Sequence, residues 1–400
     1  MIEFQNGIDA GIAEDASQIP TYSRWPIELV SGTGSYVTDS DGKSYLDFYG
    51  GHCVALLGHC HPTVVDALKK QAETLLFYSN VVYSDVRAVA AEKLLSLAGP
   101  GADRVYFCNS GTEANETALK IARKKTGKQT IIATENGFHG RTLGSLAVTW
   151  NPSYRDPYGP SLAETLFVPF GDAGAIEKAL GSSDDIAAVI IEPIQSMAGM
   201  VTAPAEYFRH IRTLCHEFDV LLVFDEIQTG AGRTGTFLYS ERLGVTPDMT
   251  TLAKSLGSGV PVGAVLTTEE VALSVRPGDH GSTFGGGMLA TAAVSSTLAA
   301  IESEGVMQNV ILIFDRIQDR LSGQNIIVRG AGCLIGLQFN RPVAPIIDQL
   351  REYGILVGGS SDSTVIRLMP PGTATLTEVD IFIDTLLHVI DDDEMTGGVV

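Results

Sequence analysis

The chain has 400 residues, of which 44% are hydrophobic and 18% charged, and its 27 basic and 47 acidic residues give a formal net charge of −20. This length exceeds one typical core, so we expect two domains or one large α/β domain with an appendage. The negative charge argues against nucleic acid or an anionic membrane as a partner. No apolar run is long enough to span a membrane, residues 1–5 lack a signal-peptide pattern, and five cysteines do not suggest a disulfide framework. These features predict a cytoplasmic protein.

The N-terminal part of the chain predicts a β-hairpin followed by two helices. Residues 34–38 and 44–48 flank Asp41-Gly42, a pair typical of tight hairpin turns. Residues 64–76 and 86–97 have apolar side chains at helical spacing.

Strands and helices then alternate from about residue 104 to residue 267. Strands are predicted at residues 105–108, 130–133, 187–191, 220–225, 249–253 and 263–267, and helices at residues 113–125 and 204–218. This rhythm is typical of a mostly parallel, doubly wound sheet that helices cover on both faces. The predicted fold class is therefore α/β.

The pattern changes near residue 289. Two helices at residues 289–304 and 307–321 precede shorter strands and helices, which indicates a smaller α+β domain. We therefore divide the chain into an N-terminal segment with the hairpin, packing with the small domain (1–50), a large α/β domain (51–288), a small C-terminal domain (289–391) and a frayed tail (392–400).

A carboxylate and a lysine follow two of the predicted strands. Asp225 ends the apolar run 221–224, and Lys254 follows the short stretch 250–253. Because a parallel sheet collects functional residues at the carboxyl ends of its strands, the two side chains could meet in one cleft. An acid that keeps a proton on a ring nitrogen and an amine that condenses with an aldehyde are what pyridoxal phosphate chemistry requires. A salt-bridged strand end and a surface lysine are the alternative interpretations.

The segment Cys-Asn-Ser-Gly-Thr-Glu at residues 108–113 lies where a strand turns into a helix. Gly111 permits a tight turn, and Ser110 and Thr112 place hydroxyls beside free N–H groups of the helix N-terminus. This arrangement is typical of a phosphate site, although an ordinary helix N-cap uses the same residue types.

Two other segments place aromatic or cationic groups at strand ends. In Phe138-His139-Gly140-Arg141 the phenyl ring could stack on a cofactor and the guanidinium could bind a carboxylate. Arg367 ends a short strand of the second domain and could bind another carboxylate. Either arginine could instead be a solvated surface group.

Two motifs are interpreted as structural. Residues 230–235 match G-x-G-x-x-G, but four residues separate them from the preceding strand and no long amphipathic helix follows. We interpret them as a flexible glycine-rich loop. His52-Cys53 and His59-Cys60-His61 lack the second ligand pair of a structural zinc site, so we expect a turn that lines a cleft or a subunit contact, and no metal.

Taken together, these segments resemble the class III (ornithine-type) aminotransferases, which are pyridoxal phosphate enzymes of fold type I. The resemblance covers nearly the whole chain and is most specific at residues 109–116, 137–142 and 225–230 and at Lys254. The acetylornithine aminotransferase branch is the most similar, chiefly at the segments that contain Asn109 and Phe138.

The resemblance implies a role for each matching residue. Lys254 would be joined covalently to pyridoxal 5'-phosphate, Asp225 would pair with the pyridine N–H, and Gln228 would contact the ring 3-hydroxyl. Arg367 would bind the α-carboxylate of glutamate or 2-oxoglutarate, Arg141 that of the second substrate, and Glu192 would support the substrate site. The other implied cofactor contacts are Ser110, Gly111, Thr112, Phe138, His139 and Thr283, the last from the partner subunit of a homodimer with shared active sites.

One position departs from the pattern of the acetylornithine branch. The branch usually has Gly-Glu after the glutamine that is Gln195 in this chain, where Ser196-Met197 stand instead. The missing glutamate is the residue expected to pair reversibly with the carboxylate-binding arginine, and a methionine cannot neutralise Arg367. The identity of the amino donor is therefore open. Residues 286–288, Gly-Gly-Met, also replace the usual Gly-Asn-Pro.

The resemblance implies a ping-pong transaminase that moves an ω-amino group from an acylated or acidic diamino acid to 2-oxoglutarate, giving a semialdehyde and glutamate. N-acetylornithine is the first expectation for the donor. The alternatives are another donor, such as ornithine or a 4-aminobutyrate-like amine, an aminomutase of the same fold, and a non-catalytic protein that binds the cofactor.

Overall fold

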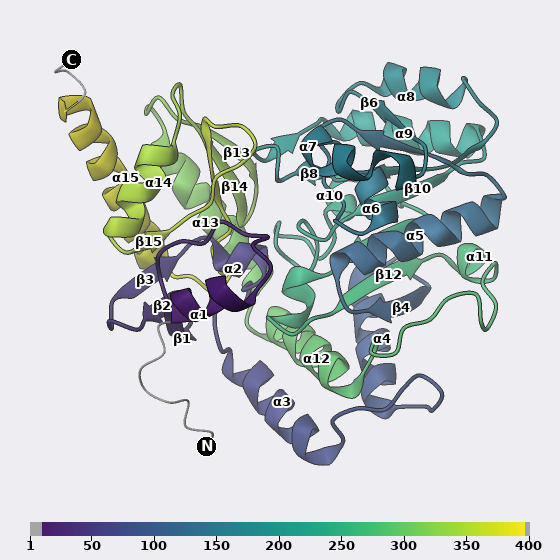
Figure 1. Cartoon of the computed structure of the whole chain (residues 1–400), viewed down its shortest axis with the longest axis horizontal. Helices are drawn as coiled ribbons and strands as arrows, with labels where there is room; N and C mark the ends of the chain where they lie inside the picture. The colour runs from purple at the N-terminus through teal and green to yellow at the C-terminus, as the bar shows by residue number, and fades with distance from the viewer. Residues whose placement is uncertain (1–9, 397–400) are drawn as a thin grey trace.

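The computed structural model describes residues 10–396, with the backbone alone described for residues 392–396. Residues 1–9 and 397–400, which belong to the predicted N-terminal segment and tail, lie outside the described residues. Figure 1 shows two parts: a large sheet with its helices, and a smaller group of C-terminal elements beside which the N-terminal strands lie.

A seven-stranded sheet organises the larger part. Its order is β4-β12-β11-β10-β7-β5-β6, and β12 alone is reversed, running antiparallel to both of its neighbours. The strands are β4 (Arg104–Cys108), β5 (Thr130–Thr134), β6 (Thr165–Val168), β7 (Ile186–Ile191), β10 (Leu221–Asp225), β11 (Met249–Leu252) and β12 (Gly263–Thr267). The predicted α/β fold with a mostly parallel sheet is confirmed, and β6 at the edge is a strand that the sequence interpretation missed.

Alternating side chains of this sheet face two apolar layers. On β10, Val223 packs in the cluster that contains α5 (Gly111–Thr126). Its neighbour Phe224 packs on the opposite side, with α8 (Ala173–Leu180) and α9 (Ala205–Glu217). Because successive residues of a strand point to opposite faces, helices bury the sheet on both sides, as the doubly wound prediction requires.

The remaining elements of the larger part are helices and two short strands. They are α3 (Pro62–Thr74), α4 (Asp85–Ala98), α6 (Leu143–Ala147), α7 (Pro152–Arg155), the 3₁₀ helix η1 (Asp156–Ser161), β8 (Ile194–Gln195), β9 (Val201–Thr202), α10 (Tyr239–Leu243), the 3₁₀ helix η2 (Lys254–Gly257), α11 (Glu269–Ala272) and α12 (Met288–Ser303). Helix α12 packs against α3 and α4.

The smaller part contains a four-stranded mixed sheet and a three-stranded antiparallel sheet. Strands β2 (Tyr36–Asp39) and β3 (Ser44–Asp47) form the hairpin around Asp41-Gly42, and β3 also pairs in parallel with β15 (Ile355–Leu356). The other elements are α1 (Ala10–Ser17), β1 (Leu29–Thr33), α2 (Gly50–Cys53), α13 (Val306–Leu321), β13 (Ile327–Ala331), β14 (Leu334–Gln338), α14 (Ala344–Glu352), β16 (Val365–Leu368) and α15 (Leu376–Thr396). The N-terminal hairpin and the C-terminal segment therefore share one sheet. The domain boundaries given above stay a prediction.

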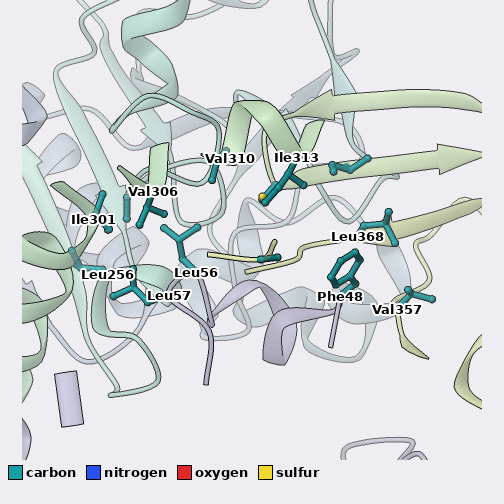
Figure 2. Close-up of a cluster of buried hydrophobic side chains, with 14 of the residues drawn as sticks. Phe48, Leu56, Leu57, Leu256, Ile301, Val306, Val310, Ile313, Val357 and Leu368 are labelled. Carbon is teal, nitrogen blue, oxygen red and sulfur yellow. The ribbon is translucent and has the colours of Figure 1, made fainter. Parts of the chain in front are cut away.

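One apolar core connects segments that are far apart in the sequence. Figure 2 shows Leu56, Leu256, Ile301, Val306 and Leu368 in this cluster, and each is at most 2% exposed. Burying such a side chain stabilises a fold by about 1.5–3 kcal/mol. The loop after Lys254 and the strand that contains Arg367 are thus fixed to a common core.

Within residues 10–396, no single helix is both long and apolar enough to cross a bilayer. Helices α12 and α13 meet the length and composition requirement only when taken together, across a bend of 64°.

Candidate active site

The residues that follow β4, β5, β7, β10 and β11 surround a cavity of about 520 Å³. Most of the predicted site residues line it: Ser110, Gly111, Thr112, Phe138, His139, Arg141, Glu192, Asp225, Gln228 and Lys254. The two that do not line it are Thr283 and Arg367. The parallel strands thus bring to one place side chains that are more than 140 residues apart along the chain, as 254 − 110 = 144 shows.

Asp225 lies at the end of β10 in a buried hydrogen-bond network. Its Oδ2 accepts from Nδ2 of Asn115 at 2.8 Å and lies 2.7 Å from Nδ1 of His139, and its Oδ1 accepts from the backbone N–H of Ile227 at 3.1 Å. Asn115 also donates to the carbonyl oxygen of His139 at 2.7 Å and accepts from the hydroxyl of Thr251 at 2.8 Å. The carboxylate therefore has one fixed orientation.

His139 has an elevated pKa despite its burial. Burial alone would lower the pKa, but the hydrogen bond and charge of Asp225, together with the charge of Glu192, raise it above its ordinary value. Its Nε2 atom is buried and has no hydrogen-bond partner within the part of the chain that the structure describes. The ring thus holds the Asp225 carboxylate through Nδ1.

Lys254 follows β11 with a backbone φ of 47°. A residue other than glycine holds this left-handed conformation only where its surroundings impose it. Burial is the main reason why the pKa of Lys254 is lowered. Cys53, Asp225 and Glu192 raise the pKa in part, and Arg367 lowers it further. A larger fraction of the amine is consequently neutral and nucleophilic.

The N-terminus of α5 forms a cradle at one wall of the cavity. Ser110 is the N-cap, and its hydroxyl accepts from the backbone N–H of Glu113 at 3.3 Å. A Cβ at Gly111 would lie 2.7 Å from Cδ1 of Ile227, so only glycine fits without displacing that side chain. The first N–H groups of a helix have no partner within it, and they attract anions. With the hydroxyl of Thr112, they make this wall suitable for a phosphate.

Glu192 and Gln228 line the cavity beside Phe138 and Asp225. Burial raises the pKa of Glu192 to about 7, and the charge of Asp225 adds to this rise, although the charges of His139 and Lys254 oppose it. The Oε1 of Glu192 accepts from the backbone N–H of Phe138 at 2.8 Å, a bond that also lowers the pKa in part. The side-chain oxygen of Gln228 accepts from the hydroxyl of Ser196 at 3.0 Å.

Arg367 is 3% exposed, and its hydrogen-bond acceptors among residues 10–391 are neutral. It donates to the carbonyl oxygen of Gly359 at 2.5 Å and to the hydroxyl of Ser196 at 3.4 Å, and its Nη1 lies 3.1 Å from Sδ of Met197. Among the side chains of residues 10–391, no carboxylate forms an ion pair with it, and burial lowers its pKa. An uncompensated buried cation favours an anionic ligand.

Arg141 has a different setting at the cavity wall. It is exposed, and its guanidinium lies 3.8 Å from the ring centroid of Tyr154 and 5.7 Å from that of Phe138. Both rings support it by cation–π contact. Its hydrogen-bond donors are therefore available to a carboxylate in the cavity.

Thr283 is exposed in the segment before α12, outside the residues that line the cavity. It was expected to act in the site of a partner subunit, so its role stays a prediction.

Asn115 and Tyr49 were not predicted to act near the site, whereas the turn that contains His52 was expected to line a cleft or a subunit contact, and His52 does line the cavity. Asn115 stands four residues after Gly111, a spacing that places both on one face of α5 and could have revealed it. Burial, followed by the charges of Lys254 and Arg367, lowers the pKa of His52 to about 4. The hydroxyl of Tyr49 hydrogen-bonds Nδ1 of His52. Within the described part of the chain, no group of three or more His, Cys, Asp or Glu side chains is placed to hold a metal.

The family model "Aminotransferase class-III" matches residues 19–390. The chain is 43% identical to an acetylornithine aminotransferase from Methanosarcina mazei, covering 95% of this chain and 96% of that protein. It is 41% identical to the acetylornithine aminotransferase of Bacillus subtilis, covering 94% of this chain and 98% of that protein.

Solved structures of aminotransferases are also similar to this chain. An ornithine aminotransferase from Toxoplasma gondii, whose active site is described as partly occupied by pyridoxal phosphate, superimposes with a TM-score of 0.89 at 31% identity and covers 96% of this chain and 95% of its own. An acetylornithine aminotransferase from Elizabethkingia anophelis has a TM-score of 0.81 at 31% identity, covering 94% and 98%. The chain therefore belongs to the class-III aminotransferases and is a pyridoxal phosphate-dependent enzyme.

Proposed function

We propose that this aminotransferase moves the terminal amino group of N-acetylornithine to 2-oxoglutarate, giving a semialdehyde and glutamate in two successive half-reactions. The names of the curated relatives support the donor. The observation that carries the proposal is the pair of arginines without a carboxylate partner among residues 10–391. Arg141 lies at the cavity wall, and Arg367 is buried near enough to lower the pKa of Lys254.

The residues around the cavity fit pyridoxal 5'-phosphate. The bare cradle at Gly111 suits the phosphate, and the buried Asp225 carboxylate, held by Asn115 and His139, suits a protonated ring nitrogen. Ser110 and Thr112 would add hydroxyls to the phosphate, Phe138 would face the ring, Gln228 would contact its 3-hydroxyl, and Nζ of Lys254 would form the covalent link. When bound, the cofactor supplies an aldehyde and a ring that accepts electrons from the substrate carbon.

The protein contributes proton handling and orientation. Because its pKa is lowered, Nζ of Lys254 can accept a proton from the substrate carbon that carries the amino group. The same Nζ can then donate this proton to the carbon on the other side of the transferred nitrogen. Asn115 and His139 hold the Asp225 carboxylate in the one orientation in which it would face the ring nitrogen. Holding the substrate in one geometry supplies a further share of the rate.

The two arginines account for the two substrates. 2-Oxoglutarate has two carboxylates, which Arg367 and Arg141 would bind. N-acetylornithine has one carboxylate, far from its terminal amine, so Arg141 would hold it. Arg367 would then face an uncharged part of the donor.

Donor-by-donor spectroscopy tests the proposal. N-acetylornithine, ornithine or 4-aminobutyrate is added to the holoenzyme, the absorbance of the protein-linked cofactor is followed, and 2-oxoglutarate is then added. We expect N-acetylornithine to bleach the absorbance fastest and 2-oxoglutarate to restore it. Faster bleaching by another donor would overturn the donor assignment. Conversion of a donor to its isomer without any keto acid would indicate an aminomutase. If no donor changed the absorbance, the protein would be a non-catalytic protein that binds the cofactor.

We further propose a cytoplasmic homodimer in which Thr283 completes the partner's site. Thr283 adjoins Phe284, which is 64% exposed, and Val81 and Tyr83 are also strongly exposed. Exposed apolar groups of this kind are typical of subunit contacts. All five cysteines are free, which suits a reducing compartment. Light scattering should give twice the chain mass, and a monomer that retains full activity would contradict the shared site.

A further inference from the structure

The glycine-rich loop at residues 230–235 is packed inside the protein. It was interpreted from the sequence as a flexible loop, yet Arg233 is fully buried and is among the largest fully buried side chains. The loop lies on the corner between α12 and α13, where a Cβ at Gly232 would be 3.2 Å from Cγ of Met307. The backbone N–H of Cys333 donates to the carbonyl oxygen of Arg233 at 2.9 Å. The glycines thus let the backbone approach these helices closely.

The guanidinium of Arg233 connects two segments of the active site. Its Nη1 donates to the carbonyl oxygens of Pro370 at 2.5 Å and Met369 at 3.4 Å, just after the strand that contains Arg367. Its Nη2 donates to the hydroxyl of Ser255 at 3.2 Å, the residue after Lys254. One planar group therefore holds the segment after the lysine and the segment after the inner arginine.

The same hydrogen bonds extend to the wall of the cavity. The hydroxyl of Ser255 donates to the carbonyl oxygen of Cys53 at 3.3 Å, and Cys53 lies between two residues that line the cavity, His52 and Val54. The backbone N–H of Met369 donates to the carbonyl oxygen of Phe48 at 2.7 Å. Displacement of Arg233 would loosen all of these segments together.

The charge of Arg233 has no carboxylate partner among the side chains of residues 10–391. All of its acceptors are neutral carbonyl or hydroxyl oxygens. A buried cation without a counter-ion is costly, and apolar packing would stabilise the same position better. The guanidinium has several N–H donors in one rigid plane, however, so it is well suited to holding two backbone segments at a fixed separation. The left-handed backbone of Lys254 also needs such support.

We propose that Arg233 is a positioning residue that fixes the separation between Nζ of Lys254 and the guanidinium of Arg367. This separation sets where a carboxylate must stand relative to the carbon that exchanges its amino group. The inference rests on the proposed role of Arg367 in binding that carboxylate. A displacement of about 1 Å between reacting groups is enough to lower a rate strongly.

Three variants test the proposal: Arg233→Met, Arg233→Lys and Ser255→Ala. Each is measured for kcat, for the Michaelis constant of the acceptor 2-oxoglutarate, for the affinity of the apoenzyme for 2-oxoglutarate by calorimetry, and for cofactor affinity. We expect Arg233→Met to weaken 2-oxoglutarate binding about tenfold or more, with a smaller loss in Arg233→Lys and Ser255→Ala. Cofactor affinity should change much less, since no contact of Arg233 lies in the phosphate cradle or the Asp225 network.

Arg316→Met is the matched control. Arg316 pairs with Asp380 through Nε and Nη2, between α13 and α15, remote from the cavity. This change should lower stability without altering 2-oxoglutarate binding. Arg367→Met, measured in parallel, separates two failures. If Arg367→Met leaves 2-oxoglutarate binding unchanged, the proposed role of Arg367 is wrong. If Arg367→Met weakens it while Arg233→Lys and Ser255→Ala bind like wild type, the positioning role of Arg233 is wrong.

Discussion

Replacing Asn115 by leucine should both destabilise the protein and weaken cofactor binding. Asn115 is fully buried and its amide makes three hydrogen bonds, to Asp225, to the carbonyl oxygen of His139 and from Thr251. Leucine has nearly the same size, so it fills the space but satisfies none of these groups. The change isolates the hydrogen bonds from the packing.

The size of the effect follows from the groups left without a partner. Losing its partner costs a buried polar group about 1–3 kcal/mol, and more when the group is charged. The carbonyl of His139 and the hydroxyl of Thr251 lose the partner that Asn115 provides, and the Asp225 carboxylate loses one of its three bonds. Together these losses give about 3–6 kcal/mol once better burial of the leucine offsets part of them. Domains are typically stable by about 5–15 kcal/mol, so the variant should fold but unfold at clearly lower denaturant concentration.

Cofactor affinity provides the decisive measurement. Asp225 in the variant keeps the bonds to His139 and Ile227 but loses one that fixes its orientation. A loss of about 1.4 kcal/mol would raise the dissociation constant tenfold, measurable by fluorescence titration of the apoenzyme. Asn309→Leu is the control, because Asn309 donates to two carbonyl oxygens outside the cavity, at 2.8 Å each. The reasoning is refuted if Asn115→Leu is destabilised like the control but binds the cofactor as tightly as wild type.

Three further predictions concern the substrate, pH and the cradle. In Met197→Glu the new carboxylate should pair with Arg367 and raise the Michaelis constant of the acceptor 2-oxoglutarate about tenfold, whereas Met197→Leu should leave it unchanged. Equal Michaelis constants for the two variants in steady-state assays would contradict this prediction. The pKa of Glu192 is raised from 4.5 to about 7, so the folded protein binds the extra proton, and the apoenzyme should lose stability as pH rises between these values. Between pH 5 and pH 8, the free energy of unfolding measured by denaturant titration should fall by about 2–3 kcal/mol less in Glu192→Gln than in the wild type. If the two proteins had the same pH dependence, the titration of Glu192 would not be its cause. Gly111→Ala should displace Ile227 and weaken cofactor binding, and Ile227→Ala in the same chain should restore part of the affinity; no recovery in the double variant would show that the contact is unimportant.

The elements with strong periodicity were predicted well from the sequence. Helix α9 was expected at residues 204–218 and is found at Ala205–Glu217, because its apolar positions recur at helical spacing. Strand β6 and helix α8 were missed, since both are short and follow an irregular segment. The reversal of β12 did have a signal: only residues 253–262 connect it to β11, too few for a parallel crossover that contains a helix.

The sequence located much of the cavity but little of what holds it together. Strand ends collect in space, so a parallel sheet was enough to predict that Asp225 and Lys254 lie together. That position 197 faces Arg367 was implied by the family resemblance and is confirmed, but local patterns do not encode it, because the contact depends on how the C-terminal strands pack against the large sheet. Arg233 was missed for the same reason, because its partners Ser255 and Pro370 are 22 and 137 residues away.

The most direct test of the account is to locate the covalent link between protein and cofactor. The holoenzyme is reduced with borohydride, digested and analysed by mass spectrometry. The account predicts one modified peptide, with the pyridoxyl phosphate group on Lys254. Activity from a protein whose Lys254 stays unmodified, or modification of another lysine in its place, would contradict it.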